Sequence, residues 1–158
     1  MLNLVMRNAT KLKQGRYVPE NPTKYEGNPS NIIFRSSWEY AVMRWCDRNP
    51  SVLKWQSEEF SVPYYFDVDQ KWHRYFVDFL VTIQTKTGVS KVMIEVKPFD
   101  QTAPPKPPKR RTQKSHIRYQ SECEEFVKNQ CKWAAATNYA KERGWAFKIL
   151  TEKELFNK

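Results

Sequence analysis

Two segments rich in β-branched and aromatic residues limit the folds open to this chain more than any other feature. Residues 72–83 carry mostly apolar side chains on both faces of an extended chain, which is typical of a central strand. A turn at Lys86-Thr87-Gly88 follows, and residues 91–97 return as a second apolar strand. The sequence therefore predicts that these two strands pair inside a sheet.

Three charged residues stand out in this apolar setting. Asp78 interrupts the first strand, whereas Glu95 and Lys97 share one face of the second. If the strands pair across the turn, Asp78 lies close to Glu95. Two buried carboxylates repel each other, and a divalent cation such as Mg²⁺, or Mn²⁺ in its place, removes that conflict and can activate a water against a phosphodiester. The alternative is that Glu95 and Lys97 are solvated charges on a half-exposed strand.

A helix is predicted to begin at Ser36 or Ser37 and to end at Asn49-Pro50. Ser36 and Glu39 have the spacing of a capping box. Helical spacing predicts a buried face formed by Trp38, Ala41, Val42 and Trp45. Glu39 then has two possible roles: it caps the helix, or it is a third carboxylate that binds a cation or holds a metal-bound water.

The other predicted elements are assigned by pattern. Residues 51–56 and 58–66 resemble a β-hairpin with Pro63 at an edge, and residues 145–150 form a last strand before a short helix. A long helix is predicted over 121–143, ended by Gly144. Its predicted inner face comprises Phe126, Val127, Trp133, Ala134, Thr137 and Ala140.

The balance of charge points to a polyanion. The 158 residues carry 27 Lys and Arg against 17 Asp and Glu, a formal net charge of +10. This favours nucleic acid, although a solvated basic surface, an acidic protein or a membrane surface also fits. Residues 98–114 form a stiff, Pro-rich basic loop. We expect five of its residues to bind DNA: Lys106, Lys109, Arg110, Arg111 and Lys114.

Several classes of protein are disfavoured. The odd number of cysteines, three, without a CxxC pair suggests neither a disulfide framework nor a zinc site, and no phosphate-binding glycine motif occurs. No apolar run is long enough to span a membrane, and the first residues lack the pattern of a secretion signal. We expect a single domain over 1–158, with 1–31 as an extended basic arm that either follows DNA or wraps its own domain.

Several short segments of the sequence resemble the PD-(D/E)XK nucleases, and more closely the head-completion nucleases of T-even-type tailed phages. The resemblance runs from the arm to the last strand, and the C-terminal part is also similar to transposon-end nucleases. Val77 stands where the motif has its nominal Pro. The segments that carry the resemblance are Tyr17–Pro22, Lys24–Gly27, Phe34–Glu39, Tyr75–Phe79 and Ile94–Pro98.

This resemblance implies an α/β fold with a restriction-endonuclease-like core, a central mixed β-sheet flanked by α-helices. It implies Glu39, Asp78 and Glu95 as the metal-binding acids and Lys97 as the catalytic lysine. It also implies Mg²⁺-dependent cleavage of double-stranded DNA during phage head completion, in the virion or the host cytoplasm, with head or portal and neck proteins as partners. Two alternatives stay open: a structural head–tail joining protein that binds DNA without cutting it, and a repair or restriction nuclease.

Overall fold

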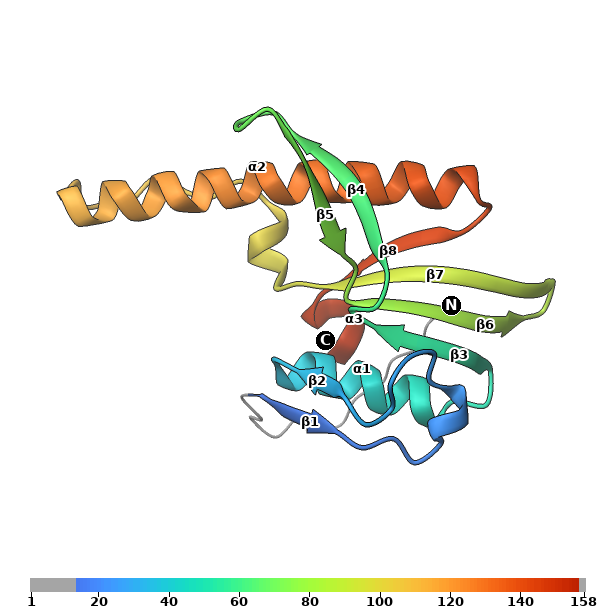
Figure 1. Cartoon of the computed structure of the whole chain (residues 1–158). Helices are drawn as coiled ribbons and strands as arrows, with labels where there is room; N and C mark the ends of the chain where they lie inside the picture. The colour runs from blue at the N-terminus through green and yellow to red at the C-terminus, as the bar shows by residue number, and fades with distance from the viewer. Residues whose placement is uncertain (1–13, 157–158) are drawn as a thin grey trace.

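The computed structural model describes residues 14–156, and the part of the predicted arm that falls in 1–13 lies outside them (Figure 1). No helix in this part of the chain is both long and apolar enough to cross a membrane. The elements in chain order are β1 Gly15–Tyr17, η1 Pro22–Lys24, β2 Ile32–Phe34, α1 Ser37–Arg48, β3 Val52–Ser57, β4 Ser61–Phe66, β5 Lys71–Phe76, β6 Phe79–Thr85, β7 Gly88–Val96, η2 Phe99–Thr102, α2 Gln113–Glu142, β8 Ala146–Leu150 and α3 Glu152–Phe156.

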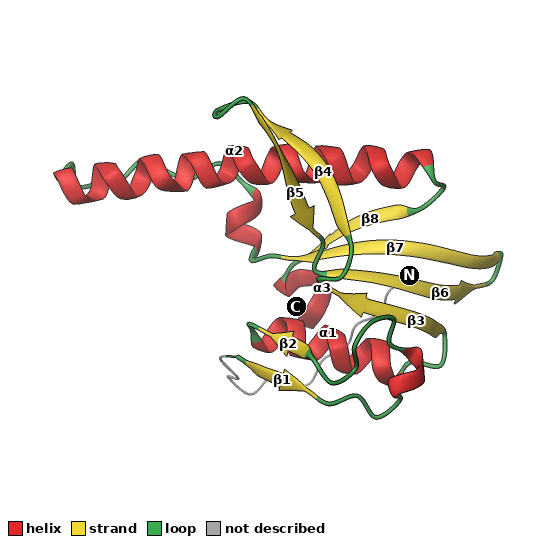
Figure 2. Ribbon diagram, viewed as in Figure 1, coloured by secondary structure: helices red, strands yellow, loops and turns green. Residues whose placement is uncertain are grey.

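A four-stranded mixed sheet with the order β3-β6-β7-β8 forms the centre of the molecule. The first two pairings, β3 with β6 and β6 with β7, are antiparallel, whereas β7 and β8 are parallel. Helices α1 and α3 lie on one side of this sheet and α2 lies on the other (Figure 2). The central mixed sheet flanked by helices is therefore confirmed.

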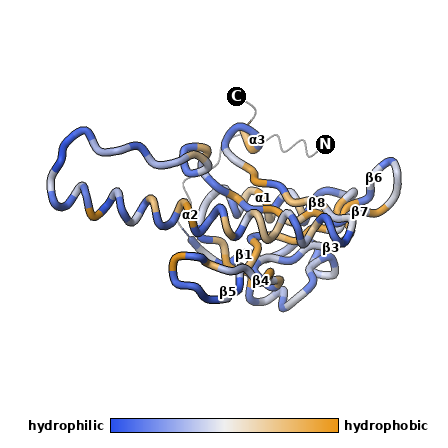
Figure 3. Tube along the Cα trace, turned by 90° about the horizontal axis from the view of Figure 1, so that it is seen from above, coloured by the Kyte–Doolittle hydropathy of each residue, from blue (hydrophilic) through white to orange (hydrophobic). Residues whose placement is uncertain are grey.

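The sheet separates two hydrophobic cores. Phe79 and Val81 of β6 point into the first core with α1 and α3, whereas Leu80 points into the second core with α2. Alternation along a strand produces this division, because successive side chains point to opposite faces. In Figure 3, apolar residues gather along the sheet, while the loop after β7 and the first half of α2 are mostly hydrophilic.

The predicted single strand over 72–83 is wrong, because the chain breaks at Val77-Asp78 into β5 and β6. Strand β6 lies in the central sheet, but β5 pairs with β4 in a separate two-stranded ribbon. Two backbone hydrogen bonds fix the break: Val77 N–H donates to the Phe60 carbonyl at 3.1 Å, and Glu58 N–H donates to the Asp78 carbonyl at 3.3 Å.

The predicted hairpin over 51–66 is wrong for a related reason. Strands β3 and β4 both exist, but β3 pairs with β6 and β4 pairs with β5. Val52 and Trp55 of β3 pack in the first core, whereas Val62 and Tyr64 of β4 pack in the second. Strands whose buried faces belong to opposite sides of a sheet cannot pair as one hairpin.

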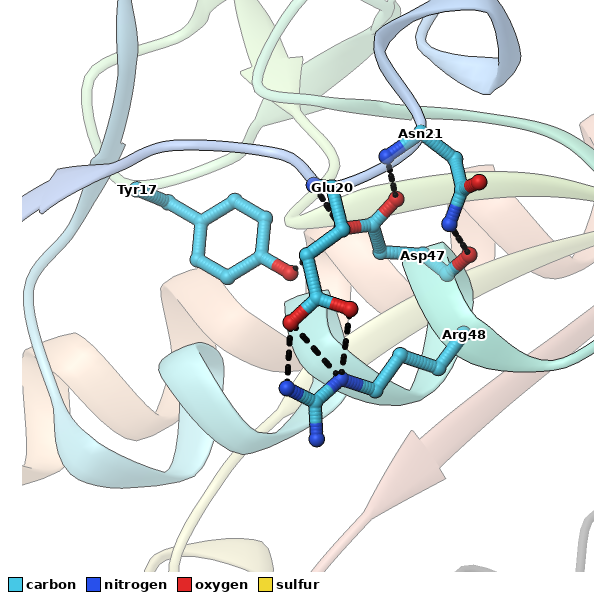
Figure 4. A network of polar contacts seen from close by, with 5 residues as sticks. All are labelled: Tyr17, Glu20, Asn21, Asp47 and Arg48. Carbon is cyan, nitrogen blue, oxygen red and sulfur yellow. Dashed lines mark hydrogen bonds and ion pairs between the residues drawn. The ribbon is translucent and has the colours of Figure 1, made fainter.

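Residues 14–31 pack against their own domain. Strand β1 pairs with β2 in an antiparallel arrangement, and Tyr17 and Tyr25 are buried in the first core. Asp47 of α1 is fully buried and anchors the segment: it accepts hydrogen bonds from the Tyr17 hydroxyl at 2.8 Å, Glu20 N–H at 2.7 Å and Asn21 N–H at 2.9 Å (Figure 4). Of the two alternatives for the arm, its described part therefore wraps the domain.

Helix α2 differs from its prediction in length and in buried face. It begins at Gln113 rather than at residue 121, because Thr112 and Ser115 form a capping box. Val127, Ala134 and Thr137 of the predicted inner face are exposed. The first half of α2 extends beyond the sheet (Figure 1), so the second half alone sets the buried stripe. That stripe comprises Asn129, Trp133, Ala136 and Ala140.

Candidate active site

The break between β5 and β6 places Asp78 beside Glu95. Phe79 pairs with Ile94 in the antiparallel ladder of β6 and β7, so the next position along brings Asp78 opposite Glu95. The Oδ2 atom of Asp78 accepts a hydrogen bond from Val96 N–H at 2.8 Å, which fixes the carboxylate at the C-terminal end of β7. Glu95 is 6% exposed. The two acids suggested by the sequence are therefore brought together.

Both carboxyl groups are shifted towards their protonated forms. Burial raises the pKa of Asp78 well above its ordinary value of 3.8, the negative charge of Glu95 raises it further, and the Val96 N–H opposes this in part. Burial also raises the pKa of Glu95, although the Tyr75 hydroxyl and the charges of Lys97 and Lys132 counteract it. Adjacent acids held in this state favour any partner that supplies positive charge.

Glu95 is held by groups from three elements. The Tyr75 hydroxyl of β5 donates to Glu95 Oε2 at 2.5 Å, and Lys97 Nζ lies 3.9 Å from Glu95 Oε1. Lys132 of α2 adds a positive charge near Glu95, and its Nζ lies 5.7 Å from the centre of the Tyr75 ring. The Glu95 carboxylate thus has a fixed orientation, with Oε2 on the tyrosine and Oε1 towards the lysine.

Glu39 lies at the margin of this pair. Its N–H donates to Ser36 Oγ at 3.1 Å, but its carboxylate accepts from Arg35 N–H at 2.7 Å rather than from Ser36, so only half of the predicted capping box forms. Burial raises the pKa of Glu39, and the nearby charge of Glu58 adds to this. The negative charge of Glu39 in turn raises the pKa of Asp78.

Arg35 and Glu58 complete the surroundings of the acids. Their side chains form an ion pair, and Arg35 is close enough for Glu39 and Asp78 to raise its pKa. Glu58 adopts a φ of +53°, a left-handed conformation that is uncommon outside glycine. This conformation lies in the connection between β3 and β4, where the chain changes from one sheet to the other.

The donor set fits a hard divalent cation. Within residues 14–156, no three Asp, Glu, His or Cys side chains lie close enough together to form a complete metal cluster. Asp78 and Glu95 instead offer two adjacent carboxylates, each with one oxygen already fixed by a hydrogen bond. Mg²⁺ suits such a pair, because it binds one or two carboxylates and keeps several waters.

The five predicted DNA-binding residues lie apart from the acids, along the loop after β7 and the first turn of α2. All five are exposed, and none forms an ion pair with another described residue. The loop begins at Pro98, directly after Lys97, and runs beside the projecting half of α2 (Figure 3). A cavity of about 810 Å³ separates the two, and Lys106 is among the residues that line it.

The sequence suggested Asp78 and Glu95 as candidate acids but did not indicate the side chains that surround them. Strict alternation along a continuous strand over 72–83 would place Tyr75 on the face opposite Asp78, but the strand breaks between the two residues. Lys132, Arg35 and Glu58 are distant from the motif in sequence, and no spacing pattern marks them. A half-buried His73 of the ribbon pairs with Asp69 at 2.7 Å and packs against Tyr64 and Phe66 rather than joining the acids.

The sequence of this chain is similar to those of known nucleases. Residues 49–152 match the family model described as TnsA-like endonuclease N terminal. Over 141 residues the chain is 38% identical to the head completion nuclease of Enterobacteria phage T4, an alignment that covers 89% of this chain and 92% of the relative. No solved structure matches. The matched segment contains Asp78, Glu95 and Lys97, and Glu39 precedes it.

Proposed function

This chain belongs to the TnsA-like endonuclease family, whose fold is restriction-endonuclease-like, and we propose that it is a metal-dependent deoxyribonuclease of the PD-(D/E)XK type. It hydrolyses phosphodiester bonds in double-stranded DNA, with Mg²⁺ as the cation and Mn²⁺ as a substitute. The observation that carries the proposal is the adjacent pair of a partly buried Asp78 and a buried Glu95, with Lys97 beside it.

Asp78 and Glu95 would hold the cation directly, and Glu39 would act at the margin through a metal-bound water. Once bound, the cation lowers the pKa of a water and stabilises charge on the scissile phosphate. Val96 N–H and the Tyr75 hydroxyl keep the two carboxylates in place, so little reorganisation is needed when the cation arrives. Burial of Glu95 lowers the local dielectric constant, which strengthens electrostatic interactions around that carboxylate.

Lys97 supplies the positive charge that the reaction requires from the protein itself. Its ammonium has three N–H donors and lies 3.9 Å from Glu95, and its side chain is 20% exposed, so the group can serve both Glu95 and a ligand in the site. From this position it can orient the attacking water or neutralise charge on a phosphate oxygen. Its backbone N–H donates to the Leu150 carbonyl at 3.0 Å. This bond continues the pairing of β7 with β8 and holds the lysine just beyond the C-terminal end of β7.

Duplex DNA would follow the basic loop to the acids. The loop begins one residue after Lys97, so a DNA backbone that reaches the site passes the base of the loop. Its five basic residues, Lys106, Lys109, Arg110, Arg111 and Lys114, are exposed and available to phosphates. They contact the backbone rather than bases, which gives affinity without sequence preference.

The biological role proposed here is head completion, on the strength of the similarity to the phage T4 protein of that name. The nuclease would process packaged DNA so that a filled head can join its tail, with head or portal and neck proteins as partners. In a phage that encodes this chain, Asp78→Asn should leave DNA-filled heads without tails in electron micrographs. Normal particle yield from that mutant would contradict the role.

The assay that tests the activity is conversion of a supercoiled plasmid in Mg²⁺ and in chelator. Wild type should nick or linearise the plasmid in Mg²⁺ only, and Asp78→Asn should not do so while its circular dichroism spectrum is unchanged. A wild-type protein that binds the plasmid but never cuts it would instead favour the structural head–tail joining protein. Full activity of Asp78→Asn would remove the acids from the mechanism.

A further inference from the structure

The β4–β5 ribbon presents an exposed row of aromatic rings to solvent. Its inward positions pack against α2, whereas its outward aromatic residues are exposed: Trp72 is 72% exposed, Phe76 46% and Tyr65 39%. Large exposed rings cost free energy in water, so a contiguous row of them marks a binding surface. The outward face comprises Ser61, Pro63, Tyr65, Trp72, Arg74 and Phe76.

This row ends close to Asp78 in the chain. The cross-strand pair of Tyr65 and Trp72 is followed towards the body by Pro63 with Arg74 and then by Ser61 with Phe76. Asp78 lies two residues beyond Phe76 along the chain. The ribbon rises from the sheet and crosses α2 (Figure 1), and the chain passes from its outward face at Phe76 to Asp78 within two residues.

Arg74 is held within the row in a form suited to a phosphate. Its Nε and Nη2 both donate to Ser61 Oγ, at 3.1 and 2.9 Å, and its guanidinium lies 5.2 Å from the centre of the Phe76 ring. A guanidinium has five N–H donors, so three are left for a ligand. Arg74 is also the one charged side chain among the six outward positions of the ribbon.

We propose that the outward face of the β4–β5 ribbon is a stacking platform for unpaired DNA bases. The proposal rests on the nuclease function and names its substrate class as duplex DNA with a frayed or single-stranded end. Trp72, Tyr65 and Phe76 stack on bases, which all have a π-face, and Arg74 binds the intervening phosphate. A closed duplex hides the faces of its bases, so the platform acts on unpaired ends alone and guides one strand towards Asp78.

A protein surface is the competing occupant of exposed aromatic residues. Two features favour DNA: the row ends two residues before Asp78 of the proposed nuclease site, and its one charge is a guanidinium rather than a carboxylate. Alternating aromatic and basic side chains match the alternating bases and phosphates of a single strand.

The test is binding of fluorescently labelled DNA in chelator, which prevents cleavage, with blunt duplex compared with duplex that has a splayed single-stranded end. Wild type should prefer the splayed end. Trp72→Ala and Phe76→Ala should each weaken binding to the splayed end by roughly five- to hundredfold and leave blunt-duplex binding nearly unchanged. Trp72→Phe should retain most of the preference. Val89→Ala, which removes an exposed apolar side chain at the start of β7, is the matched control.

Equal affinity of wild type for both DNAs, or equal loss on both in Trp72→Ala, would overturn the platform. So would a Trp72→Ala protein whose sedimentation coefficient changes while its DNA binding does not, because the row would then be an interface between proteins. A cleavage assay in Mg²⁺ distinguishes failure of the stacking platform from failure of the proposed nuclease function. If wild type prefers splayed ends but does not cut DNA, the nuclease function is contradicted and the stacking platform stands. If wild type cuts DNA but shows no preference for splayed ends, the platform is contradicted and the nuclease function stands.

Discussion

Replacing Asp78 with Asn should stabilise the metal-free protein. The substitution keeps the shape of the side chain and the oxygen that accepts from Val96 N–H, but it removes one of two adjacent negative charges. The register of β6 and β7 puts Asp78 opposite Glu95, where side-chain branch points lie about 5 Å apart. At an effective dielectric constant of about 20, two unit charges at that separation repel by about 3 kcal/mol.

The expected gain in free energy of unfolding is about 1–3 kcal/mol, because Lys97 and partial protonation of Asp78 already offset some repulsion. For a domain of this size each kcal/mol raises the melting temperature by about 2–4 °C. The folded pKa of Asp78 is raised, so the wild-type group contributes stability at low pH and loses it as pH rises through that pKa. The advantage of Asp78→Asn should therefore be largest in mildly alkaline buffer and shrink on acidification.

Divalent metal should reverse the order of the two proteins. A cation that binds only the folded wild type adds about 2.7 kcal/mol at a hundredfold excess over Kd, and the variant should gain far less. Thermal melts in chelator and across a Mg²⁺ titration measure both effects. Asp67→Asn, an exposed acid in the β4–β5 turn, is the control and should change stability by less than about 0.5 kcal/mol. A variant that melts lower in chelator, or that gains as much from Mg²⁺, would refute the reasoning.

Three further predictions concern the surroundings of the site. Tyr75→Phe should weaken Mg²⁺ binding measured by calorimetry, because Glu95 loses its hydrogen bond, and an unchanged affinity would contradict a positioning role. Joint replacement of Lys109, Arg110 and Arg111 by Ala should flatten the salt dependence of duplex binding, since each phosphate contact contributes a log–log slope of about −0.9; an unchanged slope would mean that the loop faces away from DNA. Asp47→Ala should cost about 3–5 kcal/mol in urea unfolding, because three donors lose a buried acceptor, and a cost below about 1 kcal/mol would count against that anchor.

The sequence was a good guide where one local pattern decides the structure. The turn at residues 86–88 joins β6 to β7 as expected, and Ser36 caps α1 as its spacing predicts. The approach of Asp78 to Glu95 followed from strand pairing and alternation alone. Each of these features depends on residues close together in the chain.

The sequence was a poor guide where distant segments decide the structure. Residues 72–83 look continuous, yet the strand breaks, because Val77 packs in the core under α2 while Phe79 packs in the core above α1. The core into which a side chain packs is decided by how the helices and the sheet assemble, and not by the local sequence. For the same reason no pattern could show that Tyr75 turns to Glu95 or that Lys132 of α2 lies beside them.

The initial rate of DNA cleavage against Mg²⁺ concentration, for wild type, Glu95→Gln and Lys97→Ala on one linear duplex, tests the central claim most directly. We expect saturable dependence on Mg²⁺ for wild type, a rate that vanishes in chelator, and a loss of most activity in both variants with unchanged circular dichroism. Cleavage by wild type that persists in chelator, or undiminished cleavage by Glu95→Gln, would contradict a metal-dependent nuclease built on Asp78 and Glu95.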